Sequence, residues 1–361
     1  MPPARGTMPM KKPKNAKKTV ARIMSYLSEY RLMLILVCIL VALSSGAAVA
    51  GTYFLKPIID DFIAPMIGSQ NPDFTDLLRI IIMLAAIYAM GAICTYAYNR
   101  IMVNIAADSL YKMRMDMFTH MQKLPIRYFD TRTHGEIMSR YTNDIDTMRN
   151  MMSQSIPQLV SSTITVVGVF VMMMILSIPL TVLVVVMLFV ISWVIKVVGS
   201  KSSVFYRNQQ KAIGAVNGYV EEMIDGQRVV KVFCHEEESK KNFDKINSEL
   251  CEASTKANTF ANILMPIMNN LSYIHYALTA IVGAVLTIYS GQREMGIFTL
   301  GLGALVSFLQ YTRSFAQPIT QVSQQFNVIL NALAGAERIF ALLDEEPEVD
   351  DGYVTLVNAE I

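Results

Sequence analysis

Charge is what this sequence has least of. Charged residues make up only 17% of its 361 residues, whereas a soluble domain carries about 25%. The shortage is local, because several long stretches contain no charged residue while the segments between them are rich in lysine and arginine. A chain of this length could hold about two or three soluble domains, but this distribution indicates a membrane protein.

Several short motifs are also missing. The four cysteines include no CxxC pair, which argues against a disulfide scaffold or a zinc site. His120, His134 and His235 lack the spacing of metal ligands, so we expect no metal site. No Gly-Lys dipeptide occurs, so the phosphate-binding loop G-x-x-x-x-G-K-S/T is absent. We therefore expect no catalytic residue, no cofactor and no ATP hydrolysis in this chain itself.

The long uncharged runs predict six membrane-crossing helices, since one crossing needs about 20 mostly apolar residues. Helices are favoured because lipid offers no hydrogen bonds to the backbone. The run between Arg149 and Lys196 is long enough for two crossings, and Pro179 near its middle predicts a tight hairpin. The fold class expected is all-α. The expected spans are residues 32–62, 77–99, 155–177, 180–198, 260–289 and 296–318.

The basic residues predict how the chain crosses the membrane. Residues 1–31 carry eight lysines and arginines, residues 100–149 carry eight and residues 196–256 carry ten, and the other inter-span regions share only three. Cytoplasmic loops are enriched in these residues, so both termini are expected in the cytoplasm. The basic segment 1–30 suits contact with anionic lipid better than nucleic acid.

The two basic inter-span segments are too regular to be loops. In the first arm (residues 100–149), no Gly or Pro occurs before Pro125, so the second span should continue as a helix far beyond the membrane. The sequence Thr133 to Glu136 matches a capping box that starts the return helix. In the second arm (residues 196–256), a turn is expected near Gly226, with the return helix running through residues 229–250.

Each arm would reach roughly 35–40 Å from the membrane at 1.5 Å per residue. Rigid helical hairpins of this length suit the transmission of force from a partner. The alternative is a pair of solvated arms without a partner. Tyr128 and Phe129 argue against it, because a solvated turn favours Gly, Asn or Ser.

Three stretches carry a resemblance to a known family: Leu124–Met152, Glu221–Glu237 and Phe308–Val349. In them the chain resembles the transmembrane domain of bacterial ATP-binding-cassette (ABC) exporters, of the half-size multidrug type that pairs as heterodimers. The resemblance covers nearly the whole chain from about residue 20. It implies a transmembrane domain over residues 31–335, and a linker and the start of a nucleotide-binding domain over residues 336–361.

The resemblance also implies partners and coupling segments. Two such halves form one transporter, the second arm crosses to the partner half, and ATP and Mg²⁺ bind to nucleotide-binding domains that dock on the arm tips. The family signature LSGGQ is absent, like the phosphate loop, so we expect either a longer natural chain or a stand-alone membrane subunit. The implied coupling helices are Tyr128, Phe129, Asp130, Thr131, Arg132, Thr133, His134, Gly135, Glu136 and Ile137 in the first arm, and Glu222, Met223, Ile224, Asp225, Gly226, Gln227 and Arg228 in the second.

Polar residues inside the predicted spans are candidates for the substrate path, since such groups usually face the bundle interior or a water-filled cavity. Gln310, Arg313, Gln317, Gln321 and Gln324 recur every three or four residues and so share one helix face. Hydrogen bonding between helices is the alternative reading for all of these residues. The candidate path residues are Asn269, Asn270, His275, Gln310, Arg313 and Gln317.

Taken with the resemblance, the sequence predicts ATP-driven efflux of drugs or other amphipathic compounds by alternating access. The partners expected are a second half-transporter in a homo- or heterodimer, nucleotide-binding domains, membrane lipid and a small amphipathic substrate, but no nucleic acid. The protein is expected in the bacterial cell membrane. Two alternatives stay open: a lipid or peptide exporter of the same fold, and a membrane scaffold or regulatory subunit that drives no transport.

Overall fold

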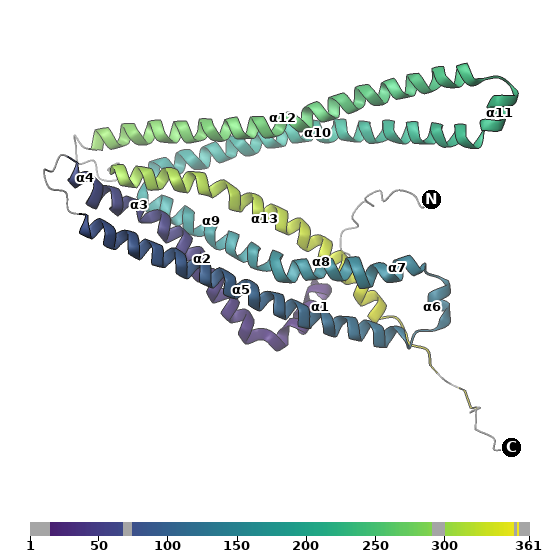
Figure 1. The fold of residues 1–361 in the computed structure, drawn as a ribbon, viewed down its shortest axis with the longest axis horizontal. Helices are drawn as coiled ribbons and strands as arrows, with labels where there is room; N and C mark the ends of the chain where they lie inside the picture. The colour runs from purple at the N-terminus through teal and green to yellow at the C-terminus, as the bar shows by residue number, and fades with distance from the viewer. Residues whose placement is uncertain (1–14, 68–73, 291–299, 350–351, 354–361) are drawn as a thin grey trace. The chain divides into compact units, whose positions relative to one another are not determined.

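The computed structural model describes residues 15–67, 74–290, 300–349 and 352–353, and helices make up nearly all of this part (Figure 1). In this part, three short π-helical turns interrupt two of the helical runs, those of residues 16–66 and 134–176. The α-helices are α1 (Ala16–Leu27), α2 (Arg31–Tyr53), α3 (Leu55–Pro57), α4 (Ala64–Met66), α5 (Thr75–Met121), α6 (Ile126–Asp130), α7 (His134–Ser139), α8 (Ile145–Asn150), α9 (Ile156–Leu176), α10 (Ile178–Asp225), α11 (Gln227–Val232), α12 (Glu236–Ser290) and α13 (Leu302–Leu343).

Six helical runs in the described part are long and apolar enough to cross a membrane, which agrees with the six predicted spans. The sixth run begins at Leu302, and residues 296–299 of the predicted span lie outside the described residues. The hairpin predicted at Pro179 is confirmed. Ser177 is extended, with φ of −165° and ψ of 111°, and Pro179 sits in the first turn of α10.

The prediction that spans continue into the arms is also confirmed. Helix α5 runs for 47 residues, α10 for 48 and α12 for 55, each well beyond the length that a membrane requires. The first arm returns as a helical run over residues 134–176 that includes two π-helical turns.

The chain divides into two compact units, one formed by residues up to Met172 and from Arg313 onward, the other by Met173–Thr312. In the first unit, one continuous core joins α1, α2, the first arm and the last turns of α13. Methionines fill much of this core, and Met102, Met113 and Met117 are almost completely buried. Their flexible side chains suit the irregular gaps between long helices.

In the second unit, α10 and α12 form an antiparallel pair along the second arm (Figure 1). The rings of Phe205 and Phe260 stack with centroids 4.6 Å apart. Farther toward the tip, the hydroxyl of Tyr219 donates to the backbone oxygen of Ser239 at 2.9 Å. These contacts fix the register of the two helices and hold the arm as one rod.

Helix α2 packs closely on α5 because small residues line their interface. A Cβ added to Gly91 would lie 3.2 Å from that of Ala47, and the hydroxyls of Ser44 and Thr95 are 2.6 Å apart. Toward the far end of α2, a Cβ added to Gly51 would lie 2.5 Å from the ring tip of Tyr88. Small residues and hydroxyl pairs of this kind let membrane helices approach closely.

The substitution Gly51→Ala should therefore destabilise the protein, by about 1–3 kcal/mol, because the added methyl overlaps Tyr88. Gly46→Ala is the matched control on the same helix, since a Cβ there meets nothing within 4 Å. Thermal unfolding of the purified protein in detergent measures both. Equal melting temperatures for the two variants would contradict the packing argument.

Candidate functional site

The tip of the first arm is the short helix α6, and its aromatic residues point inward. Tyr128 is only 4% exposed, and its hydroxyl accepts a hydrogen bond from the guanidinium of Arg140 at 2.8 Å. Phe129 packs edge-on against Tyr128 at 5.5 Å, and the guanidinium of Arg132 lies 4.5 Å from the Tyr128 ring centroid. The expectation that these aromatic residues face a partner is therefore wrong for Tyr128, which stabilises the turn instead.

The expected coupling segment of the first arm, residues 128–137, spans two helices and the turn between them. Its first three residues end α6, and its last four begin α7. Thr133 caps α7 as predicted, since its hydroxyl accepts from the backbone N–H of Glu136 at 3.2 Å. The outward face of the tip includes Ile126, which is 73% exposed and lies outside the predicted segment.

In the second arm the short helix lies farther along the chain than expected. Helix α10 continues through Asp225, Gly226 forms the junction, and α11 spans Gln227–Val232. Of residues 222–228, only the last two belong to the short helix. The return helix starts at Glu236, so the expectation that it starts at residue 229 is wrong.

A left-handed residue explains this shift. Cys234 has a φ of 53°, and its N–H donates to the backbone oxygen of Lys231 while that of His235 donates to Val230. These two bonds form a Schellman motif that ends α11. Glycine usually occupies this position because a side chain is strained there, and a cysteine gives no such signal in the sequence. Glu236 then starts α12, where a bond from its own backbone N–H lowers the pKa of its carboxyl.

The tip of the second arm carries an exposed apolar cluster that the sequence reading overlooked. Val232 is 77% exposed, Ile224 69%, Phe233 68% and Val229 60%. We call these four residues the tip cluster. A cluster of this size at the end of a helical hairpin marks an interaction surface, because water disfavours exposed apolar area.

An ion pair binds the last turns of α13 to the first arm. Asp144 is 4% exposed, and its two carboxylate oxygens accept from Nε and Nη2 of Arg338 at 2.9 and 2.5 Å. Gly335 permits this approach, since a Cβ there would lie 3.1 Å from Oγ1 of Thr147 and 3.3 Å from Asp144. The hydrogen bonds to Asp144 raise the pKa of Arg338 above its ordinary value.

The segment after α13 continues along the first arm. His120 donates from Nε2 to the backbone oxygen of Glu345 at 2.9 Å, and Arg132 donates to the Glu345 carboxylate at 3.4 Å. The backbone N–H of Glu348 then donates to the backbone oxygen of Lys123 at 2.7 Å. We call residues 344–349 the strap, because they lie against the arm close to its tip.

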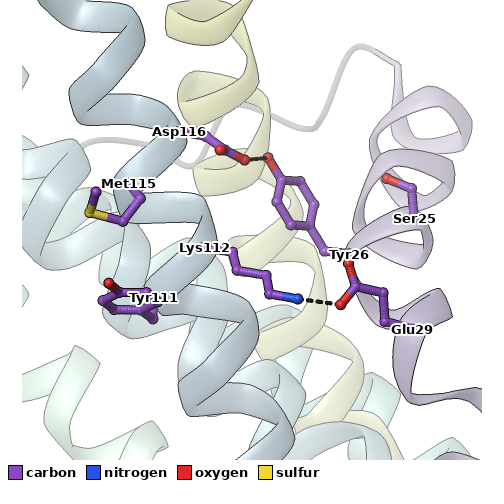
Figure 2. Close-up of a pocket in the computed structure, with 7 residues that line it drawn as sticks. All are labelled: Ser25, Tyr26, Glu29, Tyr111, Lys112, Met115 and Asp116. Carbon is purple, nitrogen blue, oxygen red and sulfur yellow. Dashed lines mark hydrogen bonds and ion pairs between the residues drawn. The ribbon is translucent and has the colours of Figure 1, made fainter.

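Helix α1 connects α5 to the end of α13. Figure 2 shows its contacts with α5, where the hydroxyl of Tyr26 donates to Asp116 at 2.7 Å and Lys112 pairs with Glu29. Burial and then the Asp116 bond raise the pKa of Tyr26 well above its ordinary value of 10.0, and the bond to Glu29 raises that of Lys112. These residues border an open hollow of about 430 Å³.

Helix α1 also contacts the end of α13 and the first residue of the strap. Arg22 donates to Asp344 at 2.6 Å, and its guanidinium lies 4.4 Å from the ring centroid of Phe340 in α13. The rings of Tyr26 and Phe340 are roughly parallel, with centroids 6.5 Å apart. Helix α1, the strap and the Asp144–Arg338 pair therefore hold the first arm and the end of α13 together.

The candidate path residues fall into two groups. His275 is 7% exposed, and its Nε2 has no hydrogen-bond partner in the described part of the chain. Asn269 and Asn270 are exposed, as are Gln310 and Gln317. The sequence alone did not distinguish buried from exposed positions among them.

Gln321 supports the alternative reading, hydrogen bonding between helices. Its side-chain oxygen accepts from Nε2 of Gln158 at 2.9 Å and from Oγ of Ser162 at 3.1 Å, both on α9. Arg313 differs, since its side chain is exposed and forms no hydrogen bond or ion pair within residues 15–67, 74–290, 300–349 and 352–353. Over the same ranges, no cluster of His, Cys, Asp and Glu could hold a metal ion.

Comparison with known proteins gives a consistent assignment. Residues 34–312 match the family described as ABC transporter transmembrane region. An uncharacterised ABC transporter ATP-binding protein of Bacillus subtilis, YfiC, is 33% identical over 94% of this chain and 54% of its own length. A fatty acid ABC transporter ATP-binding/permease protein of Mycobacterium bovis is 28% identical over 81% and 45%. An ATP-dependent lipid A-core flippase of Vibrio vulnificus is 24% identical over 95% and 56%. The chain thus spans about half the length of these relatives.

Arg338→Met should destabilise the protein by about 3 kcal/mol, because it leaves the buried Asp144 carboxylate without its cation. The double variant Asp144→Asn/Arg338→Met should regain most of that loss. Arg149→Met is the control, since its pair with Asp146 is more than half exposed and contributes at most about 1 kcal/mol. The free energies of unfolding in detergent are compared for Arg338→Met, Asp144→Asn and the double variant. If the losses of the two single variants simply add up in the double variant, the ion-pair argument is contradicted.

The raised pKa of Tyr26 predicts a distinct titration. Because the folded state holds this proton more tightly, the contact stabilises the fold below pH ~10 and loses that contribution as the pH rises above it. In absorbance titrations at alkaline pH, the Tyr26→Phe variant should therefore show the same rise in tyrosinate absorbance near pH ~10 as the wild type. If Tyr26→Phe instead lost the absorbance change of one tyrosine near pH ~10, the assignment would be refuted.

Proposed function

The chain belongs to the ABC transporter transmembrane region family, and on that basis we propose that it forms the substrate-translocating half of an exporter for amphipathic compounds. In this proposal, ATP and Mg²⁺ bind to nucleotide-binding domains, in keeping with the relatives from Bacillus subtilis and Mycobacterium bovis, which are named as ATP-binding proteins. Closure of these nucleotide-binding domains switches the membrane helices between inward- and outward-facing arrangements. In the same proposal, residues 336–361 would be the linker and the start of such a domain.

The observation that carries the proposal is the tip cluster. Four apolar side chains are 60–77% exposed at the end of a helical rod whose two helices are 48 and 55 residues long. A rod that long transmits displacement, and an apolar tip docks on a partner surface. A nucleotide-binding domain is the partner that fits the family, and it would contact the tips of both arms.

The orientation follows from the same proposal. If nucleotide-binding domains dock on the tips, the arms and both termini lie in the cytoplasm of the bacterial cell, in agreement with the basic residues of the arms. The outer surface of α10 exposes Phe189 at 73% and Trp193 at 66%. Lipid or a second half-transporter, identical or not, would cover these side chains.

The substrate class has two readings. The relatives include a fatty acid transporter, a lipid A-core flippase and a probable multidrug resistance transporter. Lipid export is therefore the closest alternative to drug efflux. A scaffold or regulatory subunit without transport is the remaining alternative.

The double variant Val232→Ser/Phe233→Ser tests the proposal in the complete transporter, reconstituted in liposomes with its nucleotide-binding domains and partner. Basal ATP hydrolysis should persist, whereas transport and its stimulation of hydrolysis should fall by about tenfold or more, a loss of about 1.4 kcal/mol in coupling. Replacing residues 128–137 with a flexible linker should give the same uncoupling.

Phe118→Ser is the control for surface apolarity, since Phe118 is 51% exposed on the side of the first arm rather than at a tip. It should leave both activities unchanged. Undiminished transport in the tip variant would contradict the coupling role. Wild-type protein that hydrolyses ATP but moves no amphiphile would favour the scaffold alternative.

A further inference from the structure

Arg313 lies deep within the membrane part of α13. Contacts farther along this helix fix its antiparallel register against the helical run of residues 134–176, since Arg338 pairs with Asp144 and Gln321 bonds to Gln158. Continued along α13, these two pairs place Arg313 level with residues 166–169, next to Gly168. Arg313 lies about 16 Å along α13 from Leu302, where the helix begins, at 1.5 Å per residue.

That level is close to the middle of the bilayer. A Cβ added to Gly168 would lie 3.3 Å from Cγ2 of Val49, and Val49 lies inside the uncharged run of α2. Along α9, Gly168 lies about 14 Å before the turn at Ser177. The hydrocarbon core is about 30 Å thick, so neither membrane surface is within easy reach of a side chain at this level.

This chain supplies no counter-charge at that depth. Arg313 is the only charged residue between Glu294 and Glu337, and residues 32–55, 80–99, 150–195 and 257–292 contain no Asp or Glu. The side chain is exposed and forms no ion pair with any described residue. An unpaired charge inside a membrane is costly and is retained for a function. Snorkelling to the surface is open to arginines near helix ends, not to one at mid-membrane.

We propose that Arg313 binds the oxyanion headgroup of the transported amphiphile, a carboxylate or a phosphate. A guanidinium presents a planar pair of N–H donors that matches either group. Gln317 is exposed one turn farther along the same face, where its amide can donate a further hydrogen bond. This proposal rests on the proposed function and narrows its substrates from amphiphiles in general to anionic ones.

The test uses the complete transporter in lipid nanodiscs and three 12-carbon probes: laurate, dodecyl phosphate and dodecyltrimethylammonium. Equilibrium titration measures the binding of each probe, and the rate of ATP hydrolysis measures how strongly each probe stimulates the transporter. Arg313→Gln should weaken binding of the anionic probes by about 10- to 100-fold and leave the cationic probe unaffected. Arg313→Lys should retain part of the affinity. The ratio of laurate to dodecyl phosphate affinity identifies the preferred headgroup.

Arg79→Gln is the matched control, since it removes one arginine from the exposed first turn of α5, where Arg79 pairs with Asp76. It should change none of the affinities. Equal weakening of all three probes by Arg313→Gln, or loss of assembly with the partner half, would overturn the proposal and indicate a structural ion pair with the partner. If the wild type binds and moves no amphiphile of any charge, the proposed function fails instead.

Discussion

The bond between Asp144 and Arg338 determines how the first unit holds together. A carboxylate that is 4% exposed is stable as an anion only with a close cation and good hydrogen-bond geometry, and the guanidinium meets both of its oxygens. Because the two residues belong to different helices, this requirement sets the rotation and register of α13 against the first arm. The close approach at Gly335 and the contact of Gln321 with α9 agree with that register.

The two arms differ in how they are stabilised. The first arm packs against α1, α13 and the strap, and its aromatic tip residues are internal. The second arm is a two-helix rod with an apolar tip that has exposed side chains on both sides of Gly226. In physical terms the first arm is part of a folded core, whereas the second leaves apolar side chains exposed at its tip.

Features that depend on local chemistry were predictable from the sequence. The uncharged runs indicated six spans, Pro179 indicated the hairpin, and Thr133 with Glu136 indicated a helix start. In each case a few adjacent residues determine the backbone, so spacing and residue type are sufficient.

Other features depend on residues far apart in the chain or on unusual backbone angles. Asp144 and Arg338 are 194 positions apart, and nothing near either one indicates the other. The end of α11 depends on a cysteine in a conformation that glycine normally adopts, so the sequence did not indicate where this short helix ends. Tyr128 lies at a hairpin tip, yet its hydroxyl accepts a hydrogen bond from the buried Arg140. Part of the candidate path was predicted as one face of α13, and on that face Gln321 bonds to α9 whereas Gln310 and Gln317 are exposed.

The strap has a consequence for sequence variation. Two of its three bonds to the arm use backbone atoms of the strap, the oxygen of Glu345 and the N–H of Glu348. Substitutions in residues 344–349 other than proline can therefore alter side chains without removing these bonds. Such a connection can accumulate mutations while the position of the chain beside the arm stays the same.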